Sequence, residues 1–228
     1  MHIDILSAVP DLMTGPLGHS ILKRAQDRGL LTVNIIDIRN YGLGKHRQID
    51  DYQYGGGAGM VMMCEPLHRA ISELKKLRDF DEIIYLTPDG ITFKQGLANK
   101  LSLSKNLMLI CGHYKGIDER IRQLHVTMEV SIGDYVLSGG ELAACIVVDA
   151  IGRLIPGVLN DESSALMDSF QDNLLAPPIY TRPANFEGLR VPEVLLSGND
   201  KAIDQWRYEM AMKSTLERRP DLLENHSE

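Results

Sequence analysis

The sequence predicts an α/β protein whose strands form a parallel sheet, and two observations support this prediction. Residues 1–8 and 31–38 are apolar runs of strand length, and a segment with helical spacing separates them. A strand, a helix and a second strand in this order indicate a parallel pair, because parallel strands need a long crossover. Glycine-bearing turns between later strands and helices, at 111–121 and 131–142, extend the same pattern.

The first strand and the helix after it are predicted from the spacing of their apolar residues. Ile3 and Ile5 fall on one face of the first strand, and Leu6 falls on the other. Gly29 is predicted to end the helix, since glycine favours the position just after a last helical turn. The helix itself has three apolar residues at helical spacing: Leu17, Ile21 and Ala25.

Asp37, near the end of the second strand, stands where a dinucleotide-binding fold would hold a ribose. However, no G-x-G-x-x-G follows the first strand, and no G-x-x-x-x-G-K-[ST] occurs in the chain. The glycines of both motifs are needed for close approach to phosphates. A nicotinamide-dependent enzyme therefore stays only a distant alternative.

Residues 39–60 form a long polar segment that ends in a glycine cluster. Lys45, His46 and Arg47 lie in its first half. A solvated, flexible loop explains such a segment, and so does a loop that binds an RNA backbone, which needs positive charge and close main-chain approach. The residues themselves leave both interpretations open.

The middle of the chain continues the strand and helix pattern. Pro66 starts a helix with one apolar face, 82–87 and 106–111 are strands, and Pro-Asp-Gly at 88–90 has turn chemistry. The loops at the carboxyl ends of parallel strands gather at a ligand crevice. The apolar face of the helix consists of Leu67, Ala70, Ile71, Leu74 and Leu77.

Two strand-to-helix loops are rich in glycine. The strand at 127–132 leads through a tight turn to Gly139 and Gly140, which open a helix whose apolar positions begin at Leu142. Glycine lets the main chain approach a ligand closely, and the first N–H groups of a helix lack intrahelical partners. The other loop follows Cys111 and starts a helix with acidic residues in its positive first turn. Together the loops predict a ligand site.

The C-terminal third has a different character. The helix from Gly140 ends near Arg153, and apolar periodicity is lost in 160–170. We predict a first domain at 1–159, a linker at 160–176 and a small, mainly helical domain at 177–228. The last helix carries three apolar residues on one face and two basic residues near its end: Ile203, Trp206, Met210, Arg218 and Arg219.

Composition limits the partners and the cellular compartment that we expect for this protein. The formal net charge of −7 argues mildly against a nucleic-acid partner, so an RNA site would have to be locally basic. The three cysteines share no metal-binding spacing, which favours reduced thiols. The N-terminus has no leader-like pattern, and no apolar run approaches the ~20 residues of a membrane helix. We therefore expect a soluble, cytoplasmic protein.

Several strings are similar to one family. CGHYKGIDERI at 111–121 and SIGDYVLSGGEL at 131–142 resemble the characteristic strings of TrmD-type tRNA (guanine-N1)-methyltransferases, which belong to the SPOUT class. YGGGAGM at 54–60, YLTPDG at 85–90, DSF at 168–170 and YTRP at 180–183 are also family-like and occur in family order. The resemblance therefore covers nearly the whole chain.

The resemblance implies a deep trefoil knot, which periodicity alone would never predict. It also implies S-adenosyl-methionine as cofactor, held by the loops after Leu86, Cys111 and Ile132, and a homodimer with the active site between subunits. Magnesium use is reported for the family, but no metal-ligand cluster stands out here, and we assign no metal residues. The implied cofactor residues are Leu86, Pro88, Gly112, Tyr114, Ile132, Gly133, Asp134, Tyr135, Val136, Leu137, Gly139 and Gly140.

The implied reaction is methylation of N1 of the guanosine at tRNA position 37, just 3′ of the anticodon, which supports reading-frame maintenance. Guanine N1 carries a proton at neutral pH, so a base must remove it, and a carboxylate suits this role. By resemblance Asp168 is that base, and Arg153 stabilises negative charge on the guanine oxygen. The expected RNA contacts are Lys45, Arg47, Arg182, Arg218 and Arg219.

Simpler interpretations exist for the two implied catalytic residues. Asp168 is one of several acids in a polar linker, and a cation such as Arg153 is favoured at any helix C-terminus. His113 and Lys115 stand where many members have Arg and Glu, and Ala58 replaces a common Pro. A non-catalytic RNA-binding module of the same fold is the rival interpretation.

Overall fold

The computed structural model describes residues 1–159 and 168–224. Its chain divides into two compact units, Met1–Asn160 and Asp161–Glu228. Residues 160–167 of the predicted linker lie outside the described residues. The assignment of the units to cofactor binding and tRNA binding stays a prediction.

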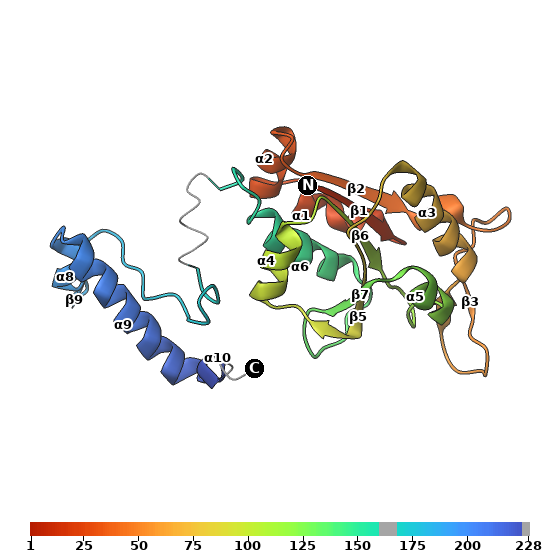
Figure 1. The fold of residues 1–228 in the computed structure, drawn as a ribbon. Coiled ribbons are helices and arrows are strands. Elements are labelled where there is room, and N and C mark those ends of the chain that lie inside the picture. Colours follow the sequence, from red (N-terminus) through yellow and green to blue (C-terminus); the bar gives the residue numbers. More distant parts are fainter. Residues whose placement is uncertain (160–167, 225–228) are drawn as a thin grey trace. The chain divides into compact units, whose positions relative to one another are not determined.

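A five-stranded parallel sheet forms the centre of the first unit, with the strand order β2-β1-β6-β5-β7 (Figure 1). The predicted α/β class with a parallel sheet is therefore confirmed. The strands are β1 (His2–Ser7), β2 (Thr32–Asp37), β5 (Glu82–Thr92), β6 (Asn106–Cys111) and β7 (Met128–Ser131).

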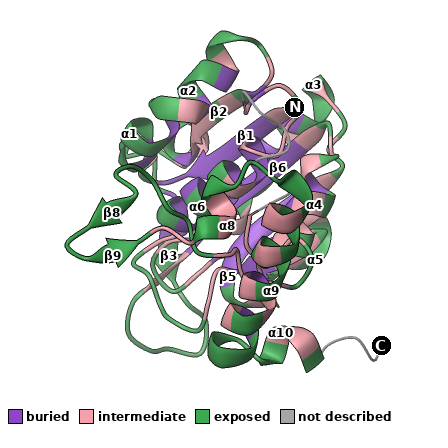
Figure 2. Ribbon diagram, turned by 90° about the vertical axis from the view of Figure 1, so that its left-hand side faces the viewer, coloured by how far each residue is buried: buried purple, intermediate pink, exposed green. Residues whose placement is uncertain are grey.

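Helices cover both faces of this sheet, and the inner strands β1 and β6 are almost entirely buried (Figure 2). Ile3 and Ile5 of β1 pack in one core cluster and Leu6 packs in the other, as their alternation predicts. The first cluster contains residues of α1 (Thr14–Leu17), α2 (Ser20–Asp27), α4 (Gln95–Ser102) and α6 (Glu141–Gly152). The second contains residues of α3 (Cys64–Leu77) and α5 (Glu119–His125).

The predicted helix through Leu17 and Ala25 is two helices. A 3-10 turn, η1 (Pro10–Met13), leads into α1, and α2 begins after a break at Gly18. The N–H of Gly18 bonds to two carbonyl groups of α1, and a Cβ there would collide with the Thr14 carbonyl. Gly29 ends α2 at a φ of +69°, as predicted.

The long polar segment after β2 is more ordered than a solvated loop. A 3-10 turn, η2 (Ile38–Tyr41), is followed by an antiparallel pair, β3 (Asp50–Tyr52) and β4 (Met60–Met62). Asp37 caps η2 by accepting a hydrogen bond from the backbone N–H of Arg39 at 2.8 Å. Met62 also forms a parallel bridge with Ile117, which attaches this hairpin to the loop after β6.

Strand β5 continues beyond the predicted turn at Pro-Asp-Gly. Leu86 and Ile91 both stand in register with Val130 of β7, so the residues between them bulge out of the ladder. A Cβ on Gly90 would lie 2.5 Å from the backbone of Glu129, which explains glycine at that position.

Three apolar helix positions are exposed, and at the first of them the helical pattern predicts a core face. Leu77 is the last residue of α3 and is 67% exposed, whereas Leu67 and Ile71 of the same predicted face are fully buried, so the prediction is wrong at this position. In α6 the stripe that begins at Leu142 is outermost, with Leu142 45% and Ile146 47% exposed. The other faces of α6 are apolar as well and fill the core.

The second unit is built around one long helix, α9 (Asp200–Arg218), with short elements beside it. Thr215 of α9 is fully buried, and its hydroxyl oxygen accepts a hydrogen bond from the N–H of Leu175 at 2.9 Å. The ring of Trp206 lies 6.3 Å from the ring of Tyr180. The short elements are β8 (Asn185–Phe186), β9 (Leu189–Arg190), α8 (Glu193–Leu196) and α10 (Asp221–Glu224).

Two further sequence-based expectations concern cysteines and membranes. Cys64, Cys111 and Cys145 are all free thiols, as predicted. Burial raises the pKa of the Cys111 thiol well above its usual value, which keeps it protonated and unreactive. Among the described residues, no helix has the length and apolar character needed to cross a bilayer.

Candidate active site

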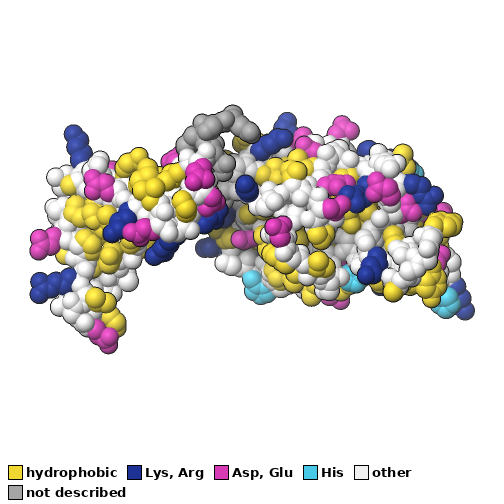
Figure 3. Space-filling model, turned by 90° about the horizontal axis from the view of Figure 1, so that it is seen from below, with side chains coloured by type: hydrophobic (Ala, Val, Ile, Leu, Met, Phe, Trp, Pro, Cys, Tyr) yellow, Lys and Arg dark blue, Asp and Glu magenta, His cyan; other side chains and the backbone are white. Residues whose placement is uncertain are grey.

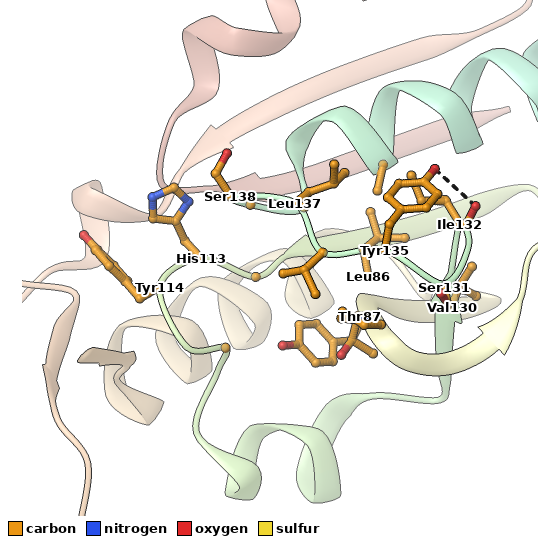
Figure 4. Close-up of a pocket in the computed structure, with 18 of the residues that line it drawn as sticks. Leu86, Thr87, His113, Tyr114, Val130, Ser131, Ile132, Tyr135, Leu137 and Ser138 are labelled. Carbon is orange, nitrogen blue, oxygen red and sulfur yellow. Dashed lines mark hydrogen bonds between the residues drawn. The ribbon is translucent and has the colours of Figure 1, made fainter. Parts of the chain in front are cut away.

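A cavity of about 280 Å³ lies where β5, β6 and β7 end. Its walls come from residues 85–88 of β5 at the start of its bulge, from 112–116 after β6, from 130–133 and 135–140 at the end of β7 and beyond, and from Ala143 of α6. Figure 4 shows Leu86, Leu137 and Tyr135 among the side chains that line the cavity. The site thus stands at the carboxyl edge of a parallel sheet, where α/β proteins bind small ligands.

The structure brings most of the predicted cofactor residues together in this cavity. Asp134 is the exception, because it is exposed at the turn beyond the positive-φ Gly133. The predicted residues that line the cavity are Leu86, Pro88, Gly112, Tyr114, Ile132, Gly133, Tyr135, Val136, Leu137, Gly139 and Gly140.

Two of the loops are joined by backbone pairing. His113 and Gly139 form an antiparallel bridge, and the N–H of Gly140 donates to the carbonyl oxygen of Gly112 at 2.8 Å. A Cβ on Gly140 would lie 2.8 Å from the Cα of Cys111 and 3.0 Å from the N of Gly112. Glycine at 140 is therefore required by contact between the two loops, whereas the sequence suggested that it makes room for a ligand.

The loop after β7 holds its own shape through short-range bonds. The hydroxyl of Ser131 donates to the carbonyl of Gly133 at 3.1 Å, and the N–H of Tyr135 bonds to the same carbonyl at 2.9 Å. The phenol of Tyr135 reaches back to the carbonyl of Ile132 at 3.4 Å (Figure 4). These contacts leave Val136, 84% exposed, at the rim of the cavity.

Sequence reasoning missed several lining residues. Thr87 and Ser131 were detectable, because Thr87 ends the predicted strand 82–87 and Ser131 lies in the predicted strand 127–132, directly before Ile132. Tyr85 was not, because it points to the opposite face of β5 and reaches the site only beneath Gly112 and Gly116. The others are His113, Lys115, Gly116, Val130, Ser138 and Ala143.

Arg122 contacts three side chains next to the cavity. Its guanidinium binds Glu129 at 2.8 Å and Asp89 at 2.7 Å, and it lies 5.5 Å from the centre of the Tyr85 ring. The Thr87 hydroxyl and then Arg122 hold the pKa of the Asp89 carboxyl below its usual range. Burial raises the pKa of the Tyr85 phenol, so this wall of the cavity is neutral at physiological pH.

The two implied catalytic residues belong to different units of the chain. Arg153 is the C-cap of α6 in the first unit, and its N–H bonds to the carbonyl of Asp149 at 3.2 Å. Asp168 is half-buried in the second unit. Neither is among the described residues that line the cavity. Their catalytic roles stay predictions.

The predicted RNA contacts are all exposed. Lys45 and Arg47 lie in the turn before β3, and Arg182 lies in the second unit. Arg219 binds Asp221 at 2.7 Å and lies 5.8 Å from the Phe170 ring, while Arg218 ends α9. On the face drawn in Figure 3, basic and acidic side chains are interspersed.

Within residues 1–159 and 168–224, no group of three His, Cys, Asp or Glu side chains is arranged to hold a metal ion. The cavity instead offers backbone groups, small side chains and apolar surface. The fold and the site thus define a class: an α/β protein whose ligand pocket is made by the loops at the carboxyl ends of parallel strands.

Comparison with known proteins identifies the family within this class. A family model described as "tRNA (Guanine-1)-methyltransferase TrmD" matches residues 1–225. The chain is 61% identical over 222 residues to the tRNA (guanine-N(1)-)-methyltransferase of Cytophaga hutchinsonii, a match that covers 97% of this chain and 94% of that protein. The proteins of the same name from Flavobacterium johnsoniae and Porphyromonas gingivalis are 56% and 55% identical, over 99% of this chain and 100% of their own length. The chain therefore belongs to the TrmD family of tRNA (guanine-1)-methyltransferases.

The contact at Gly140 predicts an effect on stability. The φ of Gly140 is −80°, so alanine meets no backbone strain there, only the collision with Cys111 and Gly112. Gly140→Ala should lower the free energy of unfolding by about 1–3 kcal/mol through overpacking. Gly96→Ala is the matched control, because nothing lies within 4 Å of a Cβ at that position of α4. Urea unfolding of the two variants measures both effects, and equal stabilities would contradict the packing argument.

Proposed function

We propose that the protein transfers a methyl group from S-adenosyl-methionine to N1 of the guanosine at tRNA position 37, just 3′ of the anticodon, and so supports reading-frame maintenance. The family match over residues 1–225 carries this proposal. The cavity at the carboxyl ends of β5, β6 and β7 supports it, because that edge is where an α/β protein offers backbone groups to a small ligand.

The cavity suits an adenosyl cofactor in its chemistry. Leu86, Ile132 and Leu137 provide apolar walls for a flat ring, and the glycine-bearing loops expose backbone donors and acceptors to its polar edges. When bound, S-adenosyl-methionine supplies a methyl group activated by the positive sulfonium. We assign the binding to the predicted residues that line the cavity and leave Asp134 out. Magnesium dependence stays open, with no ligand assigned.

We further propose that the first unit contains the deep trefoil knot of the SPOUT class. The family match over residues 1–225 carries this proposal. The bridge between His113 and Gly139 and the bond from Gly140 to Gly112 are compatible with it, because they hold against each other two loops that a knot of this class would bring together.

The proposed chemistry begins with the proton on guanine N1. Asp168 accepts it, and Arg153 stabilises the negative charge that spreads to the guanine oxygen. Asp168 belongs to the second unit and Arg153 ends α6. With a rise of 1.5 Å per residue, Arg153 stands about 20 Å along the helix from Gly140 at the cavity. One subunit alone therefore does not place Arg153 beside its own cavity.

A homodimer resolves this separation. The stripe from Leu142 through Ile146 and Asp149 to Arg153 runs along the exposed face of α6, and its first two side chains are apolar and about half exposed. If α6 of two subunits pack antiparallel about a twofold axis, Arg153 of each lies near the cavity of the other. We propose this arrangement, with the target guanosine held between subunits.

We propose that tRNA is bound through local basic groups in spite of the net charge of −7. Lys45 and Arg47 lie in the first unit, in the turn before β3. Strand β3 pairs with β4, whose Met62 is bridged to Ile117 in the loop after β6. The remaining contacts are assigned to the second unit, at Arg182, Arg218 and Arg219. Because Arg219 is already paired with Asp221, its replacement also disturbs α10.

The base assignment predicts a selective loss. Asp168→Asn should lower methyl transfer by at least about a hundredfold, since general-base catalysis contributes on that scale, while S-adenosyl-methionine affinity changes by less than a few-fold. Asp172→Asn, the same change at an exposed acid of the same unit, should keep full activity. Mass spectrometry of nucleosides from treated tRNA measures transfer, and isothermal titration measures binding. If the Asp168→Asn protein keeps its activity, Asp168 is not the base.

The RNA assignment predicts an altered salt dependence. Replacement of Lys45 and Arg47 by Gln should weaken tRNA binding and reduce the slope of log affinity against log salt by about 1 to 2, because each phosphate contact contributes roughly 0.9. The same replacement at Lys23 of α2, which is paired with Asp27, is the control. Identical slopes for the double variant and the wild type would exclude the turn that carries Lys45 and Arg47 from the RNA site.

The shared site predicts complementation between inactive variants. Leu137→Arg fills the cavity without touching the core, since Leu137 lines it and is 36% exposed. Mixing this protein with Asp168→Asn protein should restore activity. In the heterodimer, the Asp168→Asn chain contributes an intact cavity and the Leu137→Arg chain contributes an intact Asp168 to the same site. Heterodimers that form, as shown by native mass spectrometry, but stay inactive would place both groups in one subunit.

A further inference from the structure

Glu141 is a buried acid that the proposed mechanism does not use. It is the first residue of α6, and its side chain is 1% exposed. One carboxylate oxygen, Oε1, accepts a hydrogen bond from the hydroxyl of Ser7 at the end of β1, at 2.8 Å. Burial of a carboxylate is costly unless the charge is paired, and one hydroxyl with a helix N-terminus compensates only part of that cost.

The other carboxylate oxygen of Glu141 faces His113. Oε2 lies 4.0 Å from the imidazole Nδ1. Gly139 stands beside both groups: a Cβ on it would lie 2.7 Å from Nδ1 and would collide with Oε2. The absence of a side chain at 139 therefore leaves the acid and the imidazole directly opposed.

His113 connects this pair to the cavity. It lines the cavity, and its side chain is 25% exposed. Nδ1 is buried and has no hydrogen-bond partner within the part of the chain that the structure describes. Tyr114 packs edge-on against the imidazole with ring centres 4.7 Å apart, and Figure 4 shows both rings at the same end of the cavity. The ring is thus held in place while one buried nitrogen is unsatisfied.

We propose that Ser7, Glu141 and His113 form a hydrogen-bonded relay in which Glu141 accepts Nδ1–H and His113 presents Nε2 to a polar group of the bound adenosyl cofactor. A shift of the imidazole by about 1 Å brings 4.0 Å into hydrogen-bond range. Ser7 and Glu141 are positioning residues, and His113 is a binding residue. The relay rests on the proposed function for the identity of the ligand.

The physical benefit of the relay is a fixed tautomer. The hydrogen bond made by one ring nitrogen decides which nitrogen carries the proton, so a carboxylate at Nδ1 makes Nε2 of a neutral imidazole an acceptor. The contact also satisfies the buried carboxylate and the buried Nδ1 together. A neutral acceptor at Nε2 matches a hydroxyl or an ammonium group of the ligand.

The first test is the tautomer of His113, observed by ¹⁵N NMR in the complex with S-adenosyl-homocysteine. The relay requires Nδ1–H in the wild type. In Glu141→Gln, the Gln oxygen accepts from Ser7 and its NH₂ group faces His113, so Nε2–H should replace Nδ1–H. Glu65→Gln, the same change in the first turn of α3 at a half-exposed site, should leave the tautomer unchanged. A wild-type complex with Nε2–H overturns the relay.

The second test is a double-mutant cycle on the affinity for S-adenosyl-homocysteine, measured by isothermal titration. Glu141→Gln and His113→Ala should each weaken binding roughly tenfold, which is typical of a charge-assisted hydrogen bond, and the double variant should be no weaker than His113→Ala. Additive losses, or none, overturn the relay. Ser7→Ala, which removes the hydrogen bond from the Ser7 hydroxyl to the Glu141 carboxylate, should weaken binding a few-fold and decides the case if Glu141→Gln does not fold.

The two hypotheses fail differently. Wild-type protein that binds neither S-adenosyl-methionine nor S-adenosyl-homocysteine overturns the proposed function and, with it, the ligand of the relay. Wild-type binding that neither Glu141→Gln nor His113→Ala affects overturns the relay alone.

Discussion

The site depends on one close approach, between the end of β6 and the opening of α6. Gly140 stands so near Cys111 that no Cβ fits between them, and its N–H bonds to the carbonyl of Gly112. This contact fixes the loop after β6 against the loop after β7 and so determines the width of the cavity between them. It also sets the first turn of α6, which places the carboxylate of Glu141 behind Gly139 and opposite His113.

Much of the first unit follows from local pattern. The alternation in β1 predicted which residues enter each core cluster, and the glycine-rich loops predicted a ligand site. The individual residues that line the cavity were implied by the family resemblance and not by the local pattern. The contact at Gly140 could not be predicted, because its partner Cys111 is remote in sequence and the pairing depends on tertiary packing. The exposed stripe of α6 could not be predicted either, since a helix that is apolar on every side has no periodicity to indicate its outer face.

The proposed function draws on residues from more than one part of the chain. The cavity is complete within the first unit, yet Arg153 stands at the far end of α6 and Asp168 belongs to the second unit. Cofactor binding and proton removal are thus assigned to different parts of the chain. Assembly through the α6 stripe would join them only when two subunits and tRNA are present, which would protect the activated methyl group from wasteful reaction.

The central claim is that the three loops at the carboxyl ends of β5, β6 and β7 bind the adenosyl cofactor. A crystal structure of the complex with S-adenosyl-homocysteine tests it most directly. The account predicts the adenosyl group between the segments 86–88, 112–116 and 131–140, with its polar edges on backbone groups of the glycine-bearing loops. Ligand bound elsewhere on the protein, with this cavity unfilled, would contradict it.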